Sequence, residues 1–105
     1  MNKIIIEGTL VTDPELWFTK DANVAAIFSI SNIEKQENYK KINYFNVAMW
    51  GEKGEDFAVN ANKGDKVLIC GKLKNSTYHK GRINKKITGI VADEIKILEA
   101  LHENK

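Results

Sequence analysis

The sequence predicts an all-β domain with one short helix, and three observations lead to this prediction. β-branched residues and alternating apolar residues recur in short runs, which is typical of strands. The single proline and several glycines fall between these runs, where turns are expected. Residues 51–64 break the period of two, and they begin and end with glycine. Five strands and one helix account for most of the chain.

The amino-acid composition limits the number of domains and the class of protein. Its 105 residues suit one domain, and 43% hydrophobic with 29% charged residues is the profile of a soluble globular protein. We expect residues 1–99 to form the domain and residues 100–105 a short polar tail. The single cysteine, Cys70, cannot form an internal disulfide, which fits a reducing compartment. Because no segment reads as a signal peptide or a membrane span, the sequence predicts a cytoplasmic protein.

The first half of the chain predicts three strands. Residues 2–11 form a β-branched run that ends in a turn at Pro14, because proline cannot continue a strand ladder. Residues 34–41 are polar and predict a loop or a hairpin tip, and residues 42–50 predict the third strand. Between the first turn and this loop, residues 23–33 alternate and predict a half-buried strand, whose inward face holds Val24, Ala26, Phe28 and Ile30.

The second half predicts a helix and two strands. A brief helix within residues 51–64 is expected to stop at Gly64, since glycine is favoured at helix C-termini. Residues 65–78 predict a strand that buries Val67, Ile69 and Leu73, with a bend or close backbone approach at Gly71. A basic turn follows, and residues 83–98 predict the last strand.

This order of elements indicates a particular architecture. Three strands, one short helix and two more strands are the layout of the OB-fold, a five-stranded, partly open Greek-key barrel. Such barrels bind oligonucleotides or oligosaccharides, but the fold alone does not establish a function.

Aromatic residues in the third predicted strand fall on both of its faces. Side chains alternate along a strand, so Phe45, Val47 and Met49 share one face, which is apolar and expected in the core. The other face mixes rings with small or polar residues and would make a poor core. Rings on a solvated strand face can stack unpaired bases without regard to sequence. This second face consists of Tyr44, Asn46, Ala48 and Trp50.

Positive charge is concentrated between the middle of the fourth predicted strand and the start of the last one. Residues 72–86 hold six Lys or Arg and no acid, and Tyr78 lies on the lysine face of that strand. Lysines beside stacking rings would attract phosphates and make binding fall with salt. The candidate phosphate contacts are Lys72, Lys74, Lys80, Arg82, Lys85 and Lys86, with a second cluster at Lys40 and Lys41.

Simpler interpretations exist for the same residues. Tyr44 or Trp50 could cover the barrel rim or lie in a subunit interface, and the lysine run could be a solvated hairpin. Neither interpretation explains why aromatic side chains and basic side chains fall on matching faces of two strands. No nucleophile triad, paired carboxylates, phosphate loop or metal-ligand cluster occurs, so the sequence predicts no enzyme, no cofactor and no metal site.

Five segments, in this order and spacing, resemble the bacterial and phage single-stranded DNA-binding protein family over nearly the whole chain. They are "MNKIIIEGTLVTDPEL", "NVAAIFSIS", "NYFNVAMWG", "NKGDKVLICGKLKNSTY" and "TGIVADEIKILE". The resemblance implies a nonspecific single-strand binder, usually a homotetramer of OB-folds around which DNA wraps. It places the family's stacking rings at Tyr44, Trp50 and Tyr78. It also implies that the first strand pairs with its twin across a dimer axis, so Lys3, Ile4, Ile5 and Ile6 are expected at an oligomer interface.

Three positions depart from the family pattern. Gln36 stands near another family aromatic, which Tyr39 could replace. After Pro14, Phe18 is expected to pack, and Trp17 is either an additional stacking ring or an interface filler. The sequence ends in Glu103-Asn104-Lys105 without the acidic tip of cellular members, which argues against partner recruitment by that route.

The leading hypothesis is a tailless protein of a phage, plasmid or other mobile element, or a specialised paralogue, that binds and protects single-stranded DNA in replication, recombination or repair. A primosome-type accessory protein, a dimer that loads a replication machine, is the first alternative. An interaction module whose basic face meets an acidic protein or an RNA is the second. Solution mass and competition between RNA and DNA would separate the three.

Overall fold

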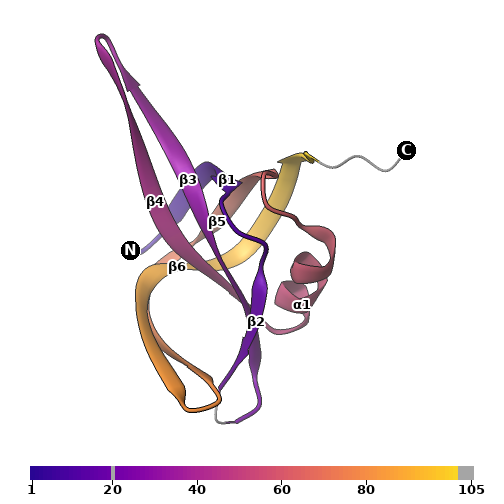
Figure 1. Ribbon diagram of the computed structural model, residues 1–105. Helices are drawn as coiled ribbons and strands as arrows, with labels where there is room; N and C mark the ends of the chain where they lie inside the picture. The colour runs from indigo at the N-terminus through magenta and orange to yellow at the C-terminus, as the bar shows by residue number, and fades with distance from the viewer. Residues whose placement is uncertain (20, 102–105) are drawn as a thin grey trace.

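The described residues form six strands and one helix. The structure is a computed structural model that describes residues 1–19 and 21–101, and the side chains of residues 78–80 and 87 lie outside what it describes. Figure 1 shows the elements in chain order. They are β1 (Ile4–Leu10), β2 (Glu15–Phe18), β3 (Val24–Gln36), β4 (Tyr39–Trp50), α1 (Gly51–Asn60), β5 (Lys66–Lys80) and β6 (Ile83–Glu99).

Five of these strands close into a ring. β1 pairs with β3 and β5, β3 pairs with β4, and β5 pairs with β6, all antiparallel. The parallel pairing of β4 with β6, at Val47 with Ile90 and Ala48 with Val91, completes the ring. A mostly β chain with one helix between the third and fourth ring strands confirms the predicted OB-fold.

The close approach of β6 to β4 depends on a glycine. A Cβ atom placed on Gly89 would lie 2.4 Å from the backbone oxygen of Asn46. Any larger residue would therefore push β6 away from β4 where their parallel pairing begins. The ring closes at this point because Gly89 has no side chain.

The sequence does not predict β2, because its pattern after Pro14 indicates only a turn. It pairs with β3 through four residues, including Trp17 with Ala25, and touches β5 where Phe18 pairs with His79. A four-residue segment carries too little periodicity to identify a strand. The free edge of β3 supplies the hydrogen bonds that the local pattern could not reveal.

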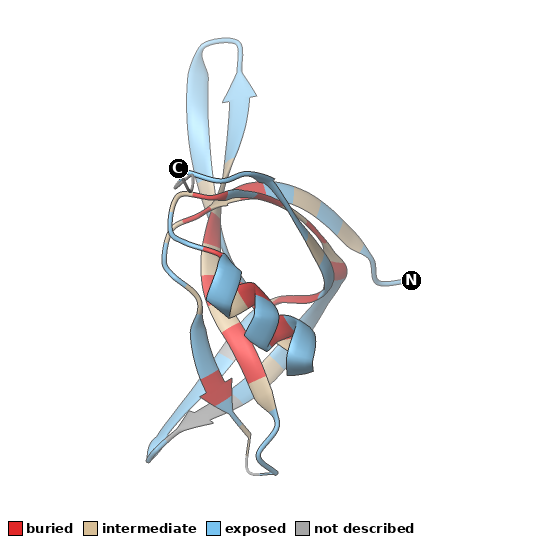
Figure 2. Cartoon of the chain, turned by 90° about the vertical axis from the view of Figure 1, so that its right-hand side faces the viewer, coloured by how far each residue is buried: buried red, intermediate tan, exposed pale blue. Residues whose placement is uncertain are grey.

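The main core lies inside the ring and under α1. Phe57 of α1 packs on Phe28 of β3 with ring centroids 5.0 Å apart. The buried residues of this cluster come from every ring strand and from the helix: Leu10, Phe28, Ile30, Val47, Met49, Phe57, Ala61, Val67, Ile69, Ile90 and Ala92. Figure 2 shows buried residues around the barrel and on the helix side that faces it.

The helix ends earlier than predicted. It stops at Asn60, and Ala61 already has extended backbone, with its N–H donating to the Phe57 carbonyl at 2.9 Å. Gly64 has φ +96° and belongs to the turn before β5, so its role as the helix stop was predicted wrongly. Its left-handed conformation still requires glycine, but for the turn.

The polar segment predicted as a loop or hairpin tip is mostly strand. β3 and β4 stay paired out to Gln36 with Tyr39, which leaves only residues 37 and 38 in the turn. The distal part of this hairpin, residues 33–42, is called the arm below. Figure 1 shows it rising away from the barrel, and Figure 2 shows it exposed. Cross-strand backbone hydrogen bonds sustain strands here without an apolar pattern.

Three side chains expected in the interior are exposed instead. Phe45 is 38% exposed because it precedes Val47, where β4 first meets β6. Leu73 is 53% exposed because it lies beyond Gly71, the last residue of β5 that pairs with β1. Phe18 is 52% exposed at the end of β2. Strand alternation grouped Phe45 and Leu73 with core residues, but it could not locate where the barrel ends, and no strand was predicted at Phe18.

The described part of the chain ends against the barrel and contains no membrane-spanning helix. The backbone N–H of Leu101 donates to Asp65 Oδ1 at 2.9 Å, so the chain stays against the barrel to that residue. Within residues 1–19 and 21–101, no helix is long and apolar enough to cross a membrane.

Candidate nucleic-acid interface

The outer face of the β2–β3–β4 sheet has two tryptophans separated by an alanine. Ala25 of β3 is the cross-strand partner of Trp17 on one side and of Trp50 on the other. Directly opposite residues project to the same face of a sheet. Trp50 packs against a second apolar cluster formed by Trp17, Ala25 and Ala48, yet it remains partly exposed. This cluster supports the Trp50 ring from beneath.

Trp17 is placed differently from the predicted stacking ring. It is only 9% exposed, and its indole Nε1–H donates to Glu15 Oε1 at 3.1 Å. The Lys85 ammonium lies 5.9 Å from the ring centroid, within the range of a cation–π contact. Burial therefore argues against an additional stacking ring, which is one of the two roles that the sequence leaves open for Trp17. Because the sequence pattern does not predict β2, it cannot decide whether Trp17 is covered.

The same face continues along β4 to Tyr44. Asn46 lies opposite Ser29, whose hydroxyl donates to Asn46 Oδ1 at 3.1 Å, and Tyr44 lies opposite Ser31. Tyr44 is 64% exposed. Six residues of extended strand separate it from Trp50, or about 20 Å at the usual rise per residue. Both rings thus lie on one sheet face, as the alternation predicted.

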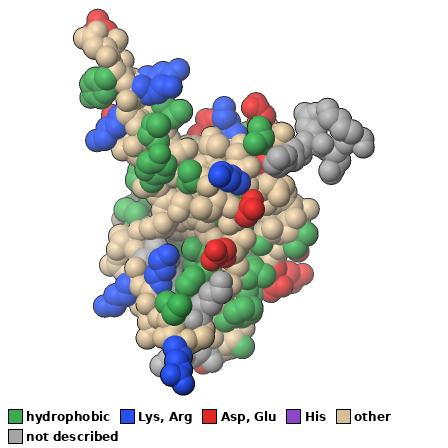
Figure 3. Space-filling view, in the orientation of Figure 1, with side chains coloured by type: hydrophobic (Ala, Val, Ile, Leu, Met, Phe, Trp, Pro, Cys, Tyr) green, Lys and Arg blue, Asp and Glu red, His purple; other side chains and the backbone are tan. Residues whose placement is uncertain are grey.

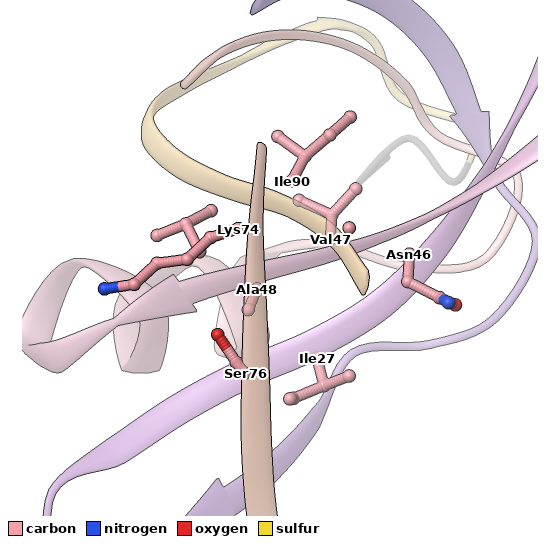
Figure 4. Close-up of a pocket in the computed structure, with 9 residues that line it drawn as sticks. Ile27, Asn46, Val47, Ala48, Lys74, Ser76 and Ile90 are labelled. Carbon is pink, nitrogen blue, oxygen red and sulfur yellow. The ribbon is translucent and has the colours of Figure 1, made fainter. Parts of the chain in front are cut away.

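The lysine face of β5 meets this sheet face. Lys74 and Ser76 line a shallow pocket together with Ile27, Asn46 and Ala48, and Figure 4 shows these five side chains around it. Lys74 is exposed. The aromatic and basic side chains, which are expected on matching faces of two separate strands, therefore lie on one continuous surface.

The other predicted cations divide into two groups. Lys72, Arg82, Lys85 and Lys86 are exposed on β5, the following turn and β6, and Figure 3 shows Lys and Arg side chains at this lower-left hairpin and on the arm. The side chains of Tyr78 and Lys80 lie outside the described part of the structure. Their backbones are paired with Lys85 and Ile83 in the same hairpin.

Lys40 and Lys41 lie on opposite faces of the arm. Lys40 pairs with Lys35 and shares the face of Tyr44, whereas Lys41 pairs with Glu34 on the reverse face. Tyr39, a possible replacement for the missing family aromatic, pairs with Gln36 on that reverse face. Lys35 was not among the predicted contacts, because its neighbour across the arm cannot be identified without the hairpin register.

The predicted interface residues are only partly available to another subunit. Ile4 and Ile6 pack against the main core, while Ile5 is 62% exposed and Lys3 is exposed just before β1. β1 pairs with β5 from Ile4 to Thr9, but with β3 only at Thr9 and Leu10. In the part of the chain that is described, the other backbone edge of β1 up to Gly8 is therefore without a strand partner.

The described residues hold no group of three or more His, Cys, Asp or Glu side chains that could ligate a metal ion. The surface around Trp50, Tyr44 and Lys74 instead combines exposed rings, amide and hydroxyl groups, and cations. These groups suit a polyanion with flat apolar bases.

Comparison with known proteins agrees with this chemistry. A single-stranded DNA-binding protein of Clostridium tetani is 29% identical over 103 residues, covering 94% of this chain and 71% of that protein. Single-stranded DNA-binding protein 3 of Clostridium acetobutylicum is also 29% identical, with 94% and 72% covered.

A solved structure has the same fold. The Plasmodium falciparum SSB in complex with ssDNA superposes with a TM-score of 0.75 at 20% identity, covering 94% of this chain and 96% of that one. The model of the single-strand binding protein family matches residues 1–98. Since that match spans almost the entire sequence, the chain belongs to the single-strand binding protein family.

Proposed function

We propose that this protein binds single-stranded DNA without sequence preference and performs no catalytic step. The observation that carries the proposal is the shared surface on which Lys74 of β5 borders the sheet face of Trp50 and Tyr44. Stacking on the rings is independent of base identity, and the lysines supply attraction to phosphates. Relatives in the family are named for the same activity.

The proposed contacts follow from exposure. Tyr44 and Trp50 stack bases, and Tyr78 is proposed as a third ring from its family position and its place in the β5–β6 hairpin. Lys85 differs from the other cations because its ammonium lies over Trp17. We assign it the task of holding the hairpin against β2. The proposed phosphate contacts are Lys40, Lys72, Lys74, Lys80, Arg82 and Lys86, and Lys41 is left out because it pairs with Glu34 on the reverse face of the arm.

Self-assembly forms part of the proposal. An unpaired strand edge is a template for pairing with another chain. The backbone edge of β1 from Ile4 to Ile6, which precedes the Glu7 carbonyl bonded to Asn32 Nδ2, has the exposed Ile5 beside it and supports pairing of two copies through β1. A dimer or tetramer of such copies would place several DNA-binding surfaces along one DNA strand. Such an assembly would act in replication, recombination or repair.

The test is a titration with oligo-dT followed by tryptophan fluorescence. Quenching and binding are expected in the wild type. The Trp50→Ala and Tyr44→Ala double variant lacks the Trp50 signal, so its binding is followed by the fluorescence anisotropy of labelled oligo-dT, and it should lose most of the affinity. A Phe18→Ala variant is the matched control, because it removes an exposed ring from β2 rather than from β4. RNA of equal length serves as competitor. Preference for RNA, or unchanged affinity of the double variant, would overturn the proposal.

A further inference from the structure

Two lysines face each other across the arm. Lys35 and Lys40 are direct cross-strand partners, and both are exposed. Directly opposite residues in an antiparallel pair have Cβ atoms about 4.5–5.5 Å apart, and like charges in that arrangement destabilise the hairpin. Because both side chains are exposed, neither lysine gains packing contacts that would offset the repulsion. The two ammonium groups therefore repel each other in the free protein without stabilising the fold.

The reverse face of the arm is built differently. Lys41 lies opposite Glu34, so a positive charge meets a negative one. Glu34 also accepts hydrogen bonds from Asn43 Nδ2 at 3.3 Å and from Gln36 Nε2 at 3.5 Å. Within residues 33–42, the face that carries Lys35 and Lys40 has no acid, and Glu37 lies in the turn at the tip. Positive charge is therefore unbalanced on one face only.

That face is continuous with the surface around Tyr44. Ile33 and Ile42 are cross-strand partners, 51% and 48% exposed, and they lie between Tyr44 and the lysine pair. Exposed apolar side chains next to a stacking ring suit the flat faces of bases and the sugar. Figure 3 shows hydrophobic side chains and Lys or Arg side chains adjoining along the arm. The pair lies about 14 Å along the strand from Tyr44.

We propose that Lys35 and Lys40 form a phosphate clamp that extends the single-strand path from Tyr44 over Ile33 and Ile42 to the end of the arm. One backbone phosphate between the two ammonium groups would remove their repulsion and form two charge-assisted hydrogen bonds. Lys41, on the balanced face, is then outside the path. This inference rests on the proposed function and names a subsite of the same interface.

The salt dependence of binding tests the clamp. Each phosphate contact to a single strand contributes about 0.7 to the slope of log affinity against log salt. The Lys35→Ala and Lys40→Ala double variant, which loses one phosphate contact, should therefore have a slope shallower by about 0.7 for long oligo-dT. Between 50 and 200 mM salt, the ratio of wild-type to variant affinity should fall about 2.6-fold. Lys41→Ala, which removes one positive charge from the reverse face of the same arm, should leave the slope nearly unchanged.

Chemical footprinting gives a readout at the residue itself. Lysine acylation of the wild-type protein, with and without oligo-dT, should show protection of Lys35 and Lys40 and little protection of Lys41. Equal protection of all three, or a slope unchanged in the double variant, would overturn the clamp. If the wild type binds no oligonucleotide at all, the proposed function itself fails. Normal binding with an unaltered slope contradicts the clamp alone.

Discussion

Ala25 determines how the two indole rings lie. It is fully buried between Trp17 and Trp50, and its small side chain leaves room for both rings on one sheet face. Parity along the sequence was enough to assign Tyr44 and Trp50 to one face. It was not enough to assign Trp17, because burial of that ring depends on β2 and on Lys85 of a distant hairpin.

Removing the Tyr44 ring should weaken DNA binding while leaving the fold intact. Tyr44→Ala is expected to cost about 1–3 kcal/mol of binding free energy, the range found for base stacking in single-strand binding proteins. Tyr39→Ala provides the comparison, since Tyr39 is similarly exposed but lies on the reverse face of the arm. Fluorescence anisotropy of labelled oligo-dT measures both. An equal loss in the two variants would show that strand parity does not define the interface.

Trp17 should matter chiefly for stability. Because its ring is 9% exposed, Trp17→Ala is expected to lower the free energy of unfolding by about 3–5 kcal/mol. Phe18→Ala, the adjacent and half-exposed ring, should cost much less. Urea unfolding monitored by circular dichroism compares the two variants. A Trp17 variant as stable as wild type would contradict its assignment to the second apolar cluster.

At the scale of elements, the strands were predictable and their junctions were not. Alternation in β3 and the glycine-bounded break at α1 identified the order of elements. β2 is not predicted because it is only four residues long, and the arm is predicted as a loop or a hairpin tip because its sequence is polar on both strands. Phe45 and Leu73 show the same limit, since their exposure depends on where β4 and β5 leave the ring.

Closure of the ring should be sensitive to Gly89. In Gly89→Ala, the new methyl group would meet the Asn46 carbonyl oxygen, so β6 must shift away from β4. A shift of this kind typically costs about 1–3 kcal/mol. Thr77→Ala, an exposed site in the same hairpin, is the control. Chemical unfolding should separate the two. Equal midpoints would mean that β4 and β6 tolerate a wider spacing.

At the scale of the whole molecule, the ring positions two hairpins around one sheet face. The arm and the β5–β6 hairpin extend from the barrel. β4, which carries Tyr44 and Trp50 on one face, meets Lys74 of β5 at the pocket. The OB-fold was predictable from element order because five strands with a helix in that place allow few other arrangements. How β5 borders β4 depends on the parallel pairing of β4 with β6, which no local pattern encodes.

Assembly through β1 predicts an effect of Ile5. Its side chain is 62% exposed, so Ile5→Asp should leave the subunit folded while it places charge beside the open edge. We expect native mass spectrometry to show fewer oligomers for this variant than for wild type at equal concentration. Val59→Asp, an exposed apolar site on α1, is the control. An unchanged oligomer distribution would exclude this edge as the interface.

The central claim is that stacking rings and phosphate-binding lysines act on one surface, and a salt series of oligo-dT titrations tests it most directly. With tryptophan fluorescence as the signal, binding should be saturable, and log affinity should fall linearly with log salt. If four or more phosphates are neutralised, the slope should be steeper than about −2.8. Absence of quenching, or quenching with an affinity that salt does not change, would contradict the account.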